Sequence, residues 1–322
     1  IIIYDQTCAT EKRRRRKRGL MPDPARRAFI NPAVCEGCGD CTMASGCVSI
    51  EPLATDLGTK RQINQNSCNK DFSCLKGFCP SFVTAEGAQL RAPETDDNSG
   101  LPNNIPMPTL PALDKTYGVV VAGIGGTGVV TIGALMGMAA HLESKGVTVL
   151  DQTGLAQKGG AVMSHIQIAA SPEKIHATRI PTASAVVLIG CDEIVAASSD
   201  VLSKVRQGLS YAVINTAQTP AAEFLTNSNW TFPKAMAESN INEALGIQCD
   251  YFDATALSLR TMGDSIYANP LLLGYAWQKG WIPLSHDALT KAIELNGVTI
   301  SKNLEAFEWG RVAAFDSRLL PM

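Results

Sequence analysis

Short apolar runs alternate with stretches of helical periodicity over residues 117 to 322. The runs YGVVVAG, VTVLD, SHIQIAA, AVVLIG and YAVINTA are almost continuously apolar, and we predict that each forms a buried strand. GVVTIGALMGMAAHLESKG has the pattern of a helix, and helical periodicity returns from about Ser265 to Arg318. Buried strands that alternate with helices are typical of a sheet covered on both faces. The predicted fold class is therefore α/β, with a doubly wound, mostly parallel sheet.

The remainder of the chain separates by composition into shorter segments. Residues 1–28 hold the apolar run IIIYDQ and the basic run KRRRRKR, which we interpret as the end of an upstream domain and a linker. Residues 29–90 form a small cysteine-rich α+β module. Residues 91–116 are rich in proline, asparagine and acid, which predicts a second linker before the α/β domain of residues 117–322.

Composition limits the class of protein. A hydrophobic content of 45%, a charged content of 18% and a net charge of -2 fit a globular protein and argue against nucleic-acid binding overall. Gly118 to Ala140 is uncharged and long enough to cross a bilayer, but its seven glycines would leave backbone amides unpaired in lipid. No secretory signal precedes the ten cysteines, so we expect a reducing compartment, the cytoplasm, and no membrane span.

The cysteine module carries the strongest chemical signal. Cys35, Cys38 and Cys41 form C-x2-C-x2-C, a spacing that lets three thiolates meet one iron–sulfur cluster, and Cys79, followed by proline, fits the fourth ligand. We therefore predict one 4Fe-4S cluster on these four residues. Zinc is the alternative, but zinc sites usually use two pairs of ligands. A zinc module that binds nucleic acid through the basic run is kept as a separate hypothesis.

Cys47, Cys68 and Cys74 remain after one cluster is filled. A second cluster on them would need an eighth thiolate, a non-cysteine ligand or a three-iron form. Cys8 is the nearby cysteine left over, and the basic run beside it makes it a poor candidate. Cys191 and Cys249 lie in apolar contexts, where isolated cysteines are usually small core residues.

A glycine loop follows the first predicted strand of the α/β domain. Gly123, Gly125 and Gly128 form G-x-G-x-x-G before a helix, and Asp151 ends the next strand, as in dinucleotide-binding folds. The alternative is that these glycines only allow close packing of strand and helix.

A second glycine pair follows further along the chain. Lys158, Gly159 and Gly160 form a candidate second contact for an anion or a partner, and we expect the nearby His165 to be a hydrogen-bonded structural histidine.

The combination resembles a known family. YDQTCATEKRRRRKRG, CEGCGDC, RQINQNSCNKDFSCLKGFCPSFVT, GIGGTGVVTIGALMGMAAHLESK and DQTGLAQKGGAV are similar to the fused, long-chain bacterial form of indolepyruvate ferredoxin oxidoreductase, a 2-oxoacid:ferredoxin oxidoreductase. They match its ferredoxin-like segment and its gamma-type domain. NPLLLGYAWQKGWIPLS and NLEAFEWGR resemble the end of the gamma-type domain.

The resemblance implies an oxidoreductase that decarboxylates aryl 2-oxoacids with thiamine diphosphate and Mg²⁺. Electrons would pass through iron–sulfur clusters to ferredoxin, and coenzyme A would take the acyl group. IIIYDQ would end a thiamine-binding domain. The thiamine signature itself is missing, since GDS at Gly263 to Ser265 has the wrong third residue. We therefore expect this chain alone to be inactive, and to work with thiamine-binding domains in an enzyme that is a dimer when intact.

The family parallel also changes the interpretation of the glycine loop. Gamma-type domains carry G-x-G-G-x-G without being nicotinamide enzymes, so Gly123, Gly125, Gly126 and Gly128 would pack against the thiamine domains or meet a phosphate of coenzyme A. An NAD-linked iron–sulfur oxidoreductase in which Asp151 binds ribose is the main competing hypothesis. For the basic run we favour a solvated linker over a surface for acidic ferredoxin or for nucleic acid.

Overall fold

The structure is a computed structural model, and it divides the chain into two compact units. It describes residues 3, 5, 7–88, 100–102, 104–154, 160–219, 224, 227 and 230–321. Unit 1 comprises Ile1–Ala92 and Thr219–Phe232, and unit 2 comprises Pro93–Gln218 and Pro233–Met322. Most of IIIYDQ lies outside the described residues.

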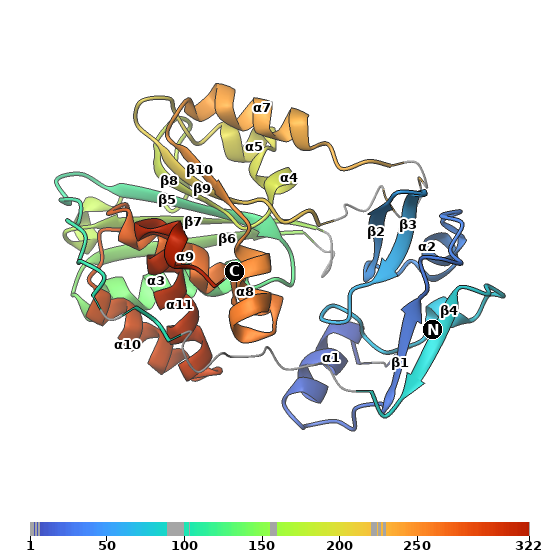
Figure 1. The fold of residues 1–322 in the computed structure, drawn as a ribbon. Helices are drawn as coiled ribbons and strands as arrows, with labels where there is room; N and C mark the ends of the chain where they lie inside the picture. The colour runs from blue at the N-terminus through green and yellow to red at the C-terminus, as the bar shows by residue number, and fades with distance from the viewer. Residues whose placement is uncertain are drawn as a thin grey trace. The chain divides into compact units, whose positions relative to one another are not determined.

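Unit 1 contains two pairs of antiparallel strands among its described residues (Figure 1). β1 pairs with β4, and β2 forms a hairpin with β3 through Thr55 and Gly58. The elements are α1 (Ala9–Lys17), β1 (Arg26–Ile30), α2 (Asp40–Ser45), β2 (Ile50–Thr55), β3 (Gly58–Ile63), the 3₁₀ turn η1 (Ser73–Leu75) and β4 (Phe82–Glu86).

The basic run is helical from Lys12 to Lys17, which the expectation of a solvated linker did not include. Lysine and arginine are good helix formers, and Arg15 pairs with Glu11 one turn earlier at 3.0 Å. Arg13 and Arg16 donate hydrogen bonds to carbonyl oxygens of the loop around Cys68. The run therefore belongs to the fold of the cysteine module.

The described residues between 219 and 232 were expected in the α/β domain, but they cluster with unit 1. Phe224 is 1% exposed, and its ring lies 4.6 Å from the guanidinium carbon of the buried Arg61. An arginine on an aromatic face gains both packing and electrostatic attraction. This contact anchors Phe224 on the β2–β3 hairpin.

Unit 2 is built on a six-stranded sheet with the order β10-β9-β8-β5-β7-β6. Its strands are β5 (Tyr117–Ile124), β6 (Gly146–Thr153), β7 (Ala161–Ala169), β8 (Ala185–Gly190), β9 (Tyr211–Asn215) and β10 (Cys249–Phe252). Its helices and 3₁₀ turns are α3 (Val129–Leu142), η2 (Pro172–Lys174), α4 (Glu193–Ala196), α5 (Ser199–Leu202), α7 (Lys234–Leu245), α8 (Ala254–Met262), η3 (Ser265–Tyr267), α9 (Ala268–Gln278), α10 (His286–Asn296), α11 (Ile300–Phe315) and η4 (Ser317–Leu319).

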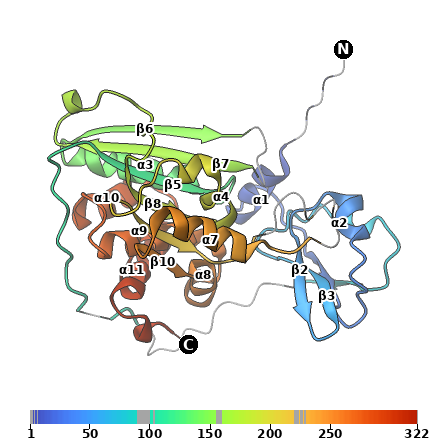
Figure 2. The same ribbon diagram turned by 90° about the horizontal axis from the view of Figure 1, so that it is seen from above.

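The sheet confirms the predicted α/β class and the positions of all five predicted strands, but β6 is an edge strand and is only partly buried. β5, β8, β9 and β10 are parallel neighbours, whereas β7 is antiparallel to both β5 and β6 (Figure 2). The sequence did not predict β10, a short strand whose four residues are only partly buried. Because β7 lies between them, β5 and β6 are not adjacent even though they follow each other along the chain.

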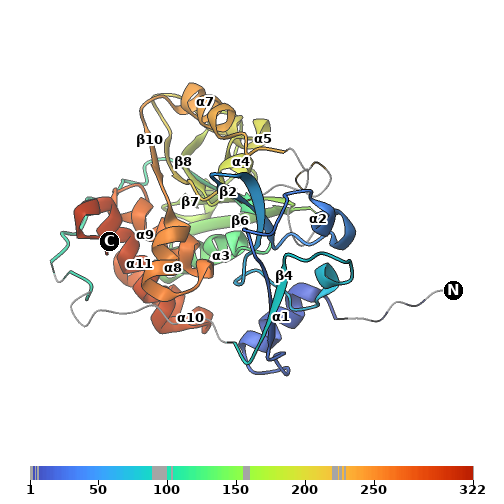
Figure 3. The same cartoon turned by 45° about the vertical axis from the view of Figure 1, so that its right-hand side comes forward.

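Helices cover both faces of this sheet (Figure 3). Val119 and Val121 of β5 point into a core formed with α3, α8, α9, α10 and α11. Val120 and Ala122 point into a second core with α4, α5 and α7. Alternate residues of one strand thus serve two cores, which is why the strand is apolar throughout.

Part of the segment expected to be a linker packs on unit 2. Leu101, Ile105 and Leu113 contact the first of the two cores. Gln278 of α9 also donates a hydrogen bond to the Pro106 carbonyl at 2.7 Å. Residues 91–99 and 103 lie outside the described residues.

Candidate functional site

The loop between β1 and α2 carries Cys35 and Cys38, and Cys41 follows in the first turn of α2. Gly37 and Gly39 have φ values of +77° and +86°, a conformation that other residues rarely adopt. A Cβ atom on Gly37 would lie 2.4 Å from the carbonyl oxygen of Thr59 on β3. The loop therefore packs tightly on the hairpin, and only glycine fits where it turns.

Cys41 packs against the core that contains the buried Cys35, and the charges of Cys35 and Cys38 act on its thiol. Burial raises the pKa of Cys41 to about 11, the charge of Arg61 opposes this, and Cys35 and Cys38 raise the pKa further. Cys35 is buried and Cys38 is exposed, so the group extends from the core of unit 1 to its surface. We call Cys35, Cys38 and Cys41 the first thiol group.

We call three further cysteines of the module, Cys47, Cys68 and Cys74, the second thiol group. Burial raises the pKa of Cys74 to about 12, and Cys47 and Cys68 raise it as well. The amide of Lys70 donates to the sulfur of Cys68 at 3.4 Å. Lys70 and Phe72 both have positive φ values, of 52° and 56°, so the chain between Cys68 and Cys74 is sharply turned.

Cys79 is not placed with either group by the contacts of the described residues. Its sulfur forms a hydrogen bond with the hydroxyl of Ser81 at 3.1 Å, and the residue is exposed. Cys8 is also exposed and immediately precedes α1. Among the described residues, no three histidine, cysteine, aspartate or glutamate side chains lie close enough to hold a metal ion.

The small core of unit 1 is lined by these thiols. Ile30, Cys35 and Ile50 are its buried members, with Cys41, Cys47 and Cys74 packed against them. A module this small has little apolar surface to bury and commonly relies on a metal or on disulfides. A donor set made of thiols alone suits iron–sulfur clusters or zinc.

The glycine loop of unit 2 joins β5 to α3, and the structure brings it beside Gly160. The amide of Gly125 donates to the Gly160 carbonyl at 2.7 Å. Gly126 and Gly128 have φ values of +86° and +102°, and Gly128 precedes α3 without a side-chain cap. Lys158 and Gly159 lie outside the described residues.

Gly123 has a packing role. A Cβ atom there would lie 2.8 Å from the Cβ of Cys191, at the end of the neighbouring strand β8. Cys191 is buried, and burial raises the pKa of its thiol. Gly123 and Cys191 are small enough to let β5, α3 and the end of β8 pack closely together.

The glycine loop lies at the carboxyl ends of β5 and β8, where the strand order reverses. Ligands of open α/β sheets bind at such a point. Asp192 follows β8, and its Oδ1 accepts a hydrogen bond from the amide of Val195 at 2.9 Å. Burial raises the pKa of Asp192 to about 6, although two backbone amides oppose this effect. Across the loop, Asn269 of α9 donates to the carbonyl of Thr127 at 3.1 Å.

Asp151 does not meet the glycine loop in the way that dinucleotide binding requires. It lies on β6, two strands away from β5, and accepts a hydrogen bond from Ser164 of β7. The ribose-binding acid of a dinucleotide fold ends the strand next to the glycine loop. The inserted β7 therefore removes the geometric basis of the NAD hypothesis.

His165 is a buried structural histidine, as expected. Its ring nitrogens meet the Gln152 side chain at 3.1 Å and the Ile180 amide at 3.4 Å. Burial, together with the charges of Arg179 and Lys204, lowers its pKa to about 4, so the ring is neutral at physiological pH.

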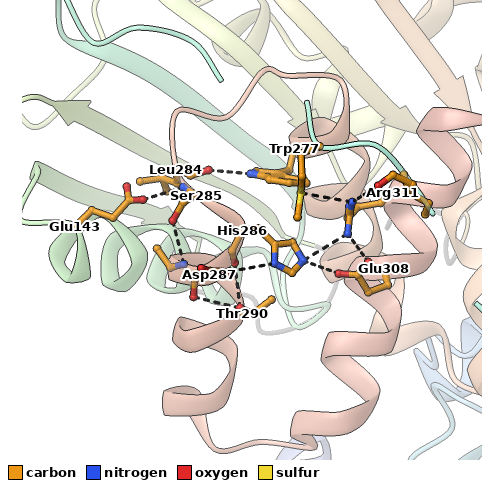
Figure 4. A network of polar contacts seen from close by, with 12 residues as sticks. Glu143, Trp277, Leu284, Ser285, His286, Asp287, Thr290, Glu308 and Arg311 are labelled. Carbon is orange, nitrogen blue, oxygen red and sulfur yellow. Dashed lines mark hydrogen bonds and ion pairs between the residues drawn. The ribbon is translucent and has the colours of Figure 1, made fainter. Parts of the chain in front are cut away.

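A polar network that the sequence did not predict joins α9, α10 and α11 (Figure 4). Arg311 donates to Glu308 at 2.6 Å and to Gln278 at 3.0 Å, and it lies over the ring of Trp277. Burial would raise the pKa of Glu308, but hydrogen bonding by His286 and the charge of Arg311 lower it. The spacing of Glu308 and Arg311 by three residues was the available signal. We assign this network a structural role.

Comparison with known proteins identifies the family. The profile of the family described as pyruvate ferredoxin/flavodoxin oxidoreductase matches residues 118–313. The chain belongs to this family. Its function is that of a 2-oxoacid ferredoxin oxidoreductase subunit, and neither the NAD-linked nor the zinc-based hypothesis finds support.

Individual relatives agree with this assignment. The chain is 26% identical over 203 residues to the indolepyruvate oxidoreductase subunit IorB of Thermococcus kodakarensis, covering 62% of this chain and 96% of the relative. The IorB subunit of Methanothermobacter thermautotrophicus is 27% identical over 203 residues and is covered to 99%, with 62% of this chain aligned.

Among solved structures, pyruvate oxidoreductase subunit PORC of Thermotoga maritima matches with a TM-score of 0.45 and 19% identity. This match covers 62% of this chain and 96% of that one. Within the described ranges, each helix is too short or too polar to cross a membrane.

Proposed function

We propose that this chain is the electron-relay and gamma-type part of a fused indolepyruvate-type oxidoreductase that acts on aryl 2-oxoacids. The observation that carries the proposal is the small core of unit 1, in which Cys41, Cys47 and Cys74 pack against the buried Cys35 and its neighbours. This unit precedes a domain of the oxidoreductase family in the same chain. A module that holds redox clusters and precedes such a domain in the chain would be suited to removing electrons from its reaction.

The first thiol group would hold a 4Fe-4S cluster. Cys35, Cys38 and Cys41 supply three thiolates from one loop, and Cys79 would supply the fourth after turning from Ser81. When bound, such a cluster accepts and releases one electron at a time. The Arg61 guanidinium favours the ionised form of Cys41, which is the form that binds iron.

The second thiol group would hold a second cluster. Cys47, Cys68 and Cys74 supply three thiolates, which suits a three-iron form or a cubane whose last iron takes a ligand other than cysteine. The amide of Lys70 beside Cys68 is a hydrogen-bond donor of the kind that tunes cluster potential. Two clusters would let an electron cross unit 1 in steps.

The other parts of the reaction would lie outside this sequence. Thiamine diphosphate with Mg²⁺ would be held by thiamine-binding domains, and ferredoxin would accept the electrons in the cytoplasm. The intact enzyme would be a dimer. Because no thiamine signature occurs in the sequence, we expect no decarboxylation from this chain alone.

Metal analysis tests the cluster proposal. The chain would be purified without oxygen, and iron, acid-labile sulfide and zinc measured per chain, with electron paramagnetic resonance after reduction. We expect seven to eight irons, on the order of one four-iron and one three- or four-iron cluster. Cys38→Ser and Cys74→Ser should each remove one signal and leave the other, whereas the control Cys249→Ser should change neither. Zinc without sulfide in protein never exposed to oxygen would refute the proposal.

For the glycine loop we propose a contact with a phosphate of coenzyme A. Two observations support this contact. The start of α3 has no side-chain cap, and the amide of Gly125 in the same loop donates to the carbonyl of Gly160. Backbone amides at the start of a helix bind anions. Gly125→Val should weaken coenzyme A binding at least about tenfold in calorimetry, because a bulky side chain would crowd this approach. Gly154→Ala, at a position with open space around it, is the control. Equal affinity for both variants would contradict the contact.

A further inference from the structure

Helix α1 is fixed directly onto the loop that carries Cys68. Arg13 donates to the Ser67 carbonyl at 2.9 Å, and Arg16 donates to the Asn69 carbonyl at 2.5 Å. The two arginines therefore hold the backbone on either side of one cysteine of the second thiol group. Hydrogen bonds from a charged donor are stronger than neutral ones, so this attachment is firm.

The outer side of α1 presents cations to solvent. Arg14 and Arg18 are exposed, and Arg15, which is also exposed, is paired with Glu11. The whole chain has a net charge of -2, so this concentration of positive charge is local. An exposed helix face of one sign attracts a partner of the opposite sign over a distance set by the salt concentration.

A cavity of about 130 Å³ continues the positive surface towards the cysteine. Its lining includes Cys68 and cationic side chains from three parts of unit 1, namely Arg13, Arg16, Lys17, Arg27 and Lys70. Asp23 is the acid in this lining, and it is paired with Lys70. The lining of the cavity therefore presents positive charge to the carboxylate groups of a partner, next to Cys68 of the second thiol group.

We infer that α1 is the docking surface for an acidic iron–sulfur carrier protein, and that electrons leave this chain through the cluster of the second thiol group. The inference rests on the proposed function and adds the place of electron exit. The second thiol group would hold a cluster that, when reduced, would supply one electron to the oxidised cluster of the carrier, with no proton or bond transferred. Docking by charge brings the two clusters close while leaving the complex short-lived.

Rapid-mixing kinetics on the full chain test the inference. The chain, loaded with iron and sulfide and reduced anaerobically, is mixed with oxidised acidic ferredoxin at several salt concentrations. Arg14→Glu/Arg18→Glu should lower the second-order rate constant about tenfold at low salt, and the difference should vanish at high salt. The control Lys174→Glu/Arg206→Glu reverses two exposed charges on unit 2 and should leave the rate constant unchanged.

The iron and sulfide content distinguishes failure of the docking surface from failure of the proposed function. If the variant keeps both clusters and transfers electrons at the unchanged rate, the docking surface is refuted and the proposed function stands. If the unaltered chain binds no iron and sulfide, both are refuted. Should the reversal variant lose its clusters, the milder Arg14→Gln/Arg18→Gln pair decides by the same rate measurement. Tight binding of duplex DNA to α1 with unchanged transfer to ferredoxin would assign the surface to nucleic acid.

Discussion

The contact between α9 and α11 gives the sharpest stability prediction. These helices approach at two glycines, each facing the backbone of the other helix. A Cβ atom on Gly274 would lie 2.0 Å from the carbonyl oxygen of Phe307, and one on Gly310 would lie 1.9 Å from that of Leu271. Ordinary contacts begin at 3.4 Å, so Gly274→Ala would force the helices apart by about 1.4 Å.

The magnitude follows from two opposing effects. Alanine stabilises a helix interior relative to glycine by about 1 kcal/mol. Overpacking costs about 1–3 kcal/mol, and the upper end applies here because both obstructing atoms belong to backbone and cannot rotate away. We therefore expect a net loss of about 2 kcal/mol for either variant, or about 4–8 °C in the melting temperature of unit 2.

Thermal unfolding followed by tryptophan fluorescence measures this loss, since Trp277 and Trp309 are buried at these helices. Gly137→Ala in α3 is the matched control, because its new Cβ would meet only a side-chain methyl of Val149, at 3.1 Å. The double variant Gly274→Ala/Gly310→Ala should lose less than the sum of the two, because one separation relieves both clashes. Melting temperatures that rise in all three single variants alike would refute the packing argument.

Three further predictions follow from burial and backbone geometry. Asp192→Asn should raise the free energy of unfolding by about 1–2 kcal/mol at pH 8 and leave it unchanged near pH 3.5. Burial raises the pKa of Asp192 in the folded protein to about 6. The stability that the protonated carboxyl provides below the unfolded pKa is therefore lost as the pH rises through 6. Urea titrations that show an equal gain for Asp192→Asn at both pH values would contradict this reasoning. Phe224→Ala should destabilise unit 1 by about 3–5 kcal/mol, whereas Phe224→Leu, which keeps an apolar side chain under Arg61, should cost about 1–2 kcal/mol in the same titration. Gly37→Ala should reduce the iron content of the purified chain by about half because it clashes with Thr59 as well as straining a positive φ, whereas Gly87→Ala strains φ in open space and should load normally.

Much of unit 2 could be predicted because its signals are local. The runs of β5 and β8 form strands that are covered on both faces, and a strand of this kind is apolar at nearly every position. The run of β6 forms an edge strand that is only partly buried. The short β10 lacks that signal because its residues are only partly buried. Its place at the sheet edge is decided by pairing with β9, which no local pattern encodes.

The candidate sites divide in the same way. The spacing of Cys35, Cys38 and Cys41 by itself predicts that their thiolates bind one cluster, because cysteines so close together in the chain can converge on one site. The grouping of Cys47 with Cys68 and Cys74 depends on how the hairpin folds back, which spacing does not reveal. Asp151 shows the reverse case, since its spacing fits a ribose-binding acid until β7 separates its strand from the glycine loop.

The sequence by itself determined the buried strands, the glycine turn before α3 and the first thiol group, because these follow from periodicity and from contacts between near neighbours in the chain. Only the tertiary structure decided that the basic run is a helix held on the Cys68 loop, and that Phe224 belongs with Arg61 in unit 1. Both contacts join residues more than fifty positions apart. Their formation depends on the packing of the whole unit, so no local pattern of residues contains them.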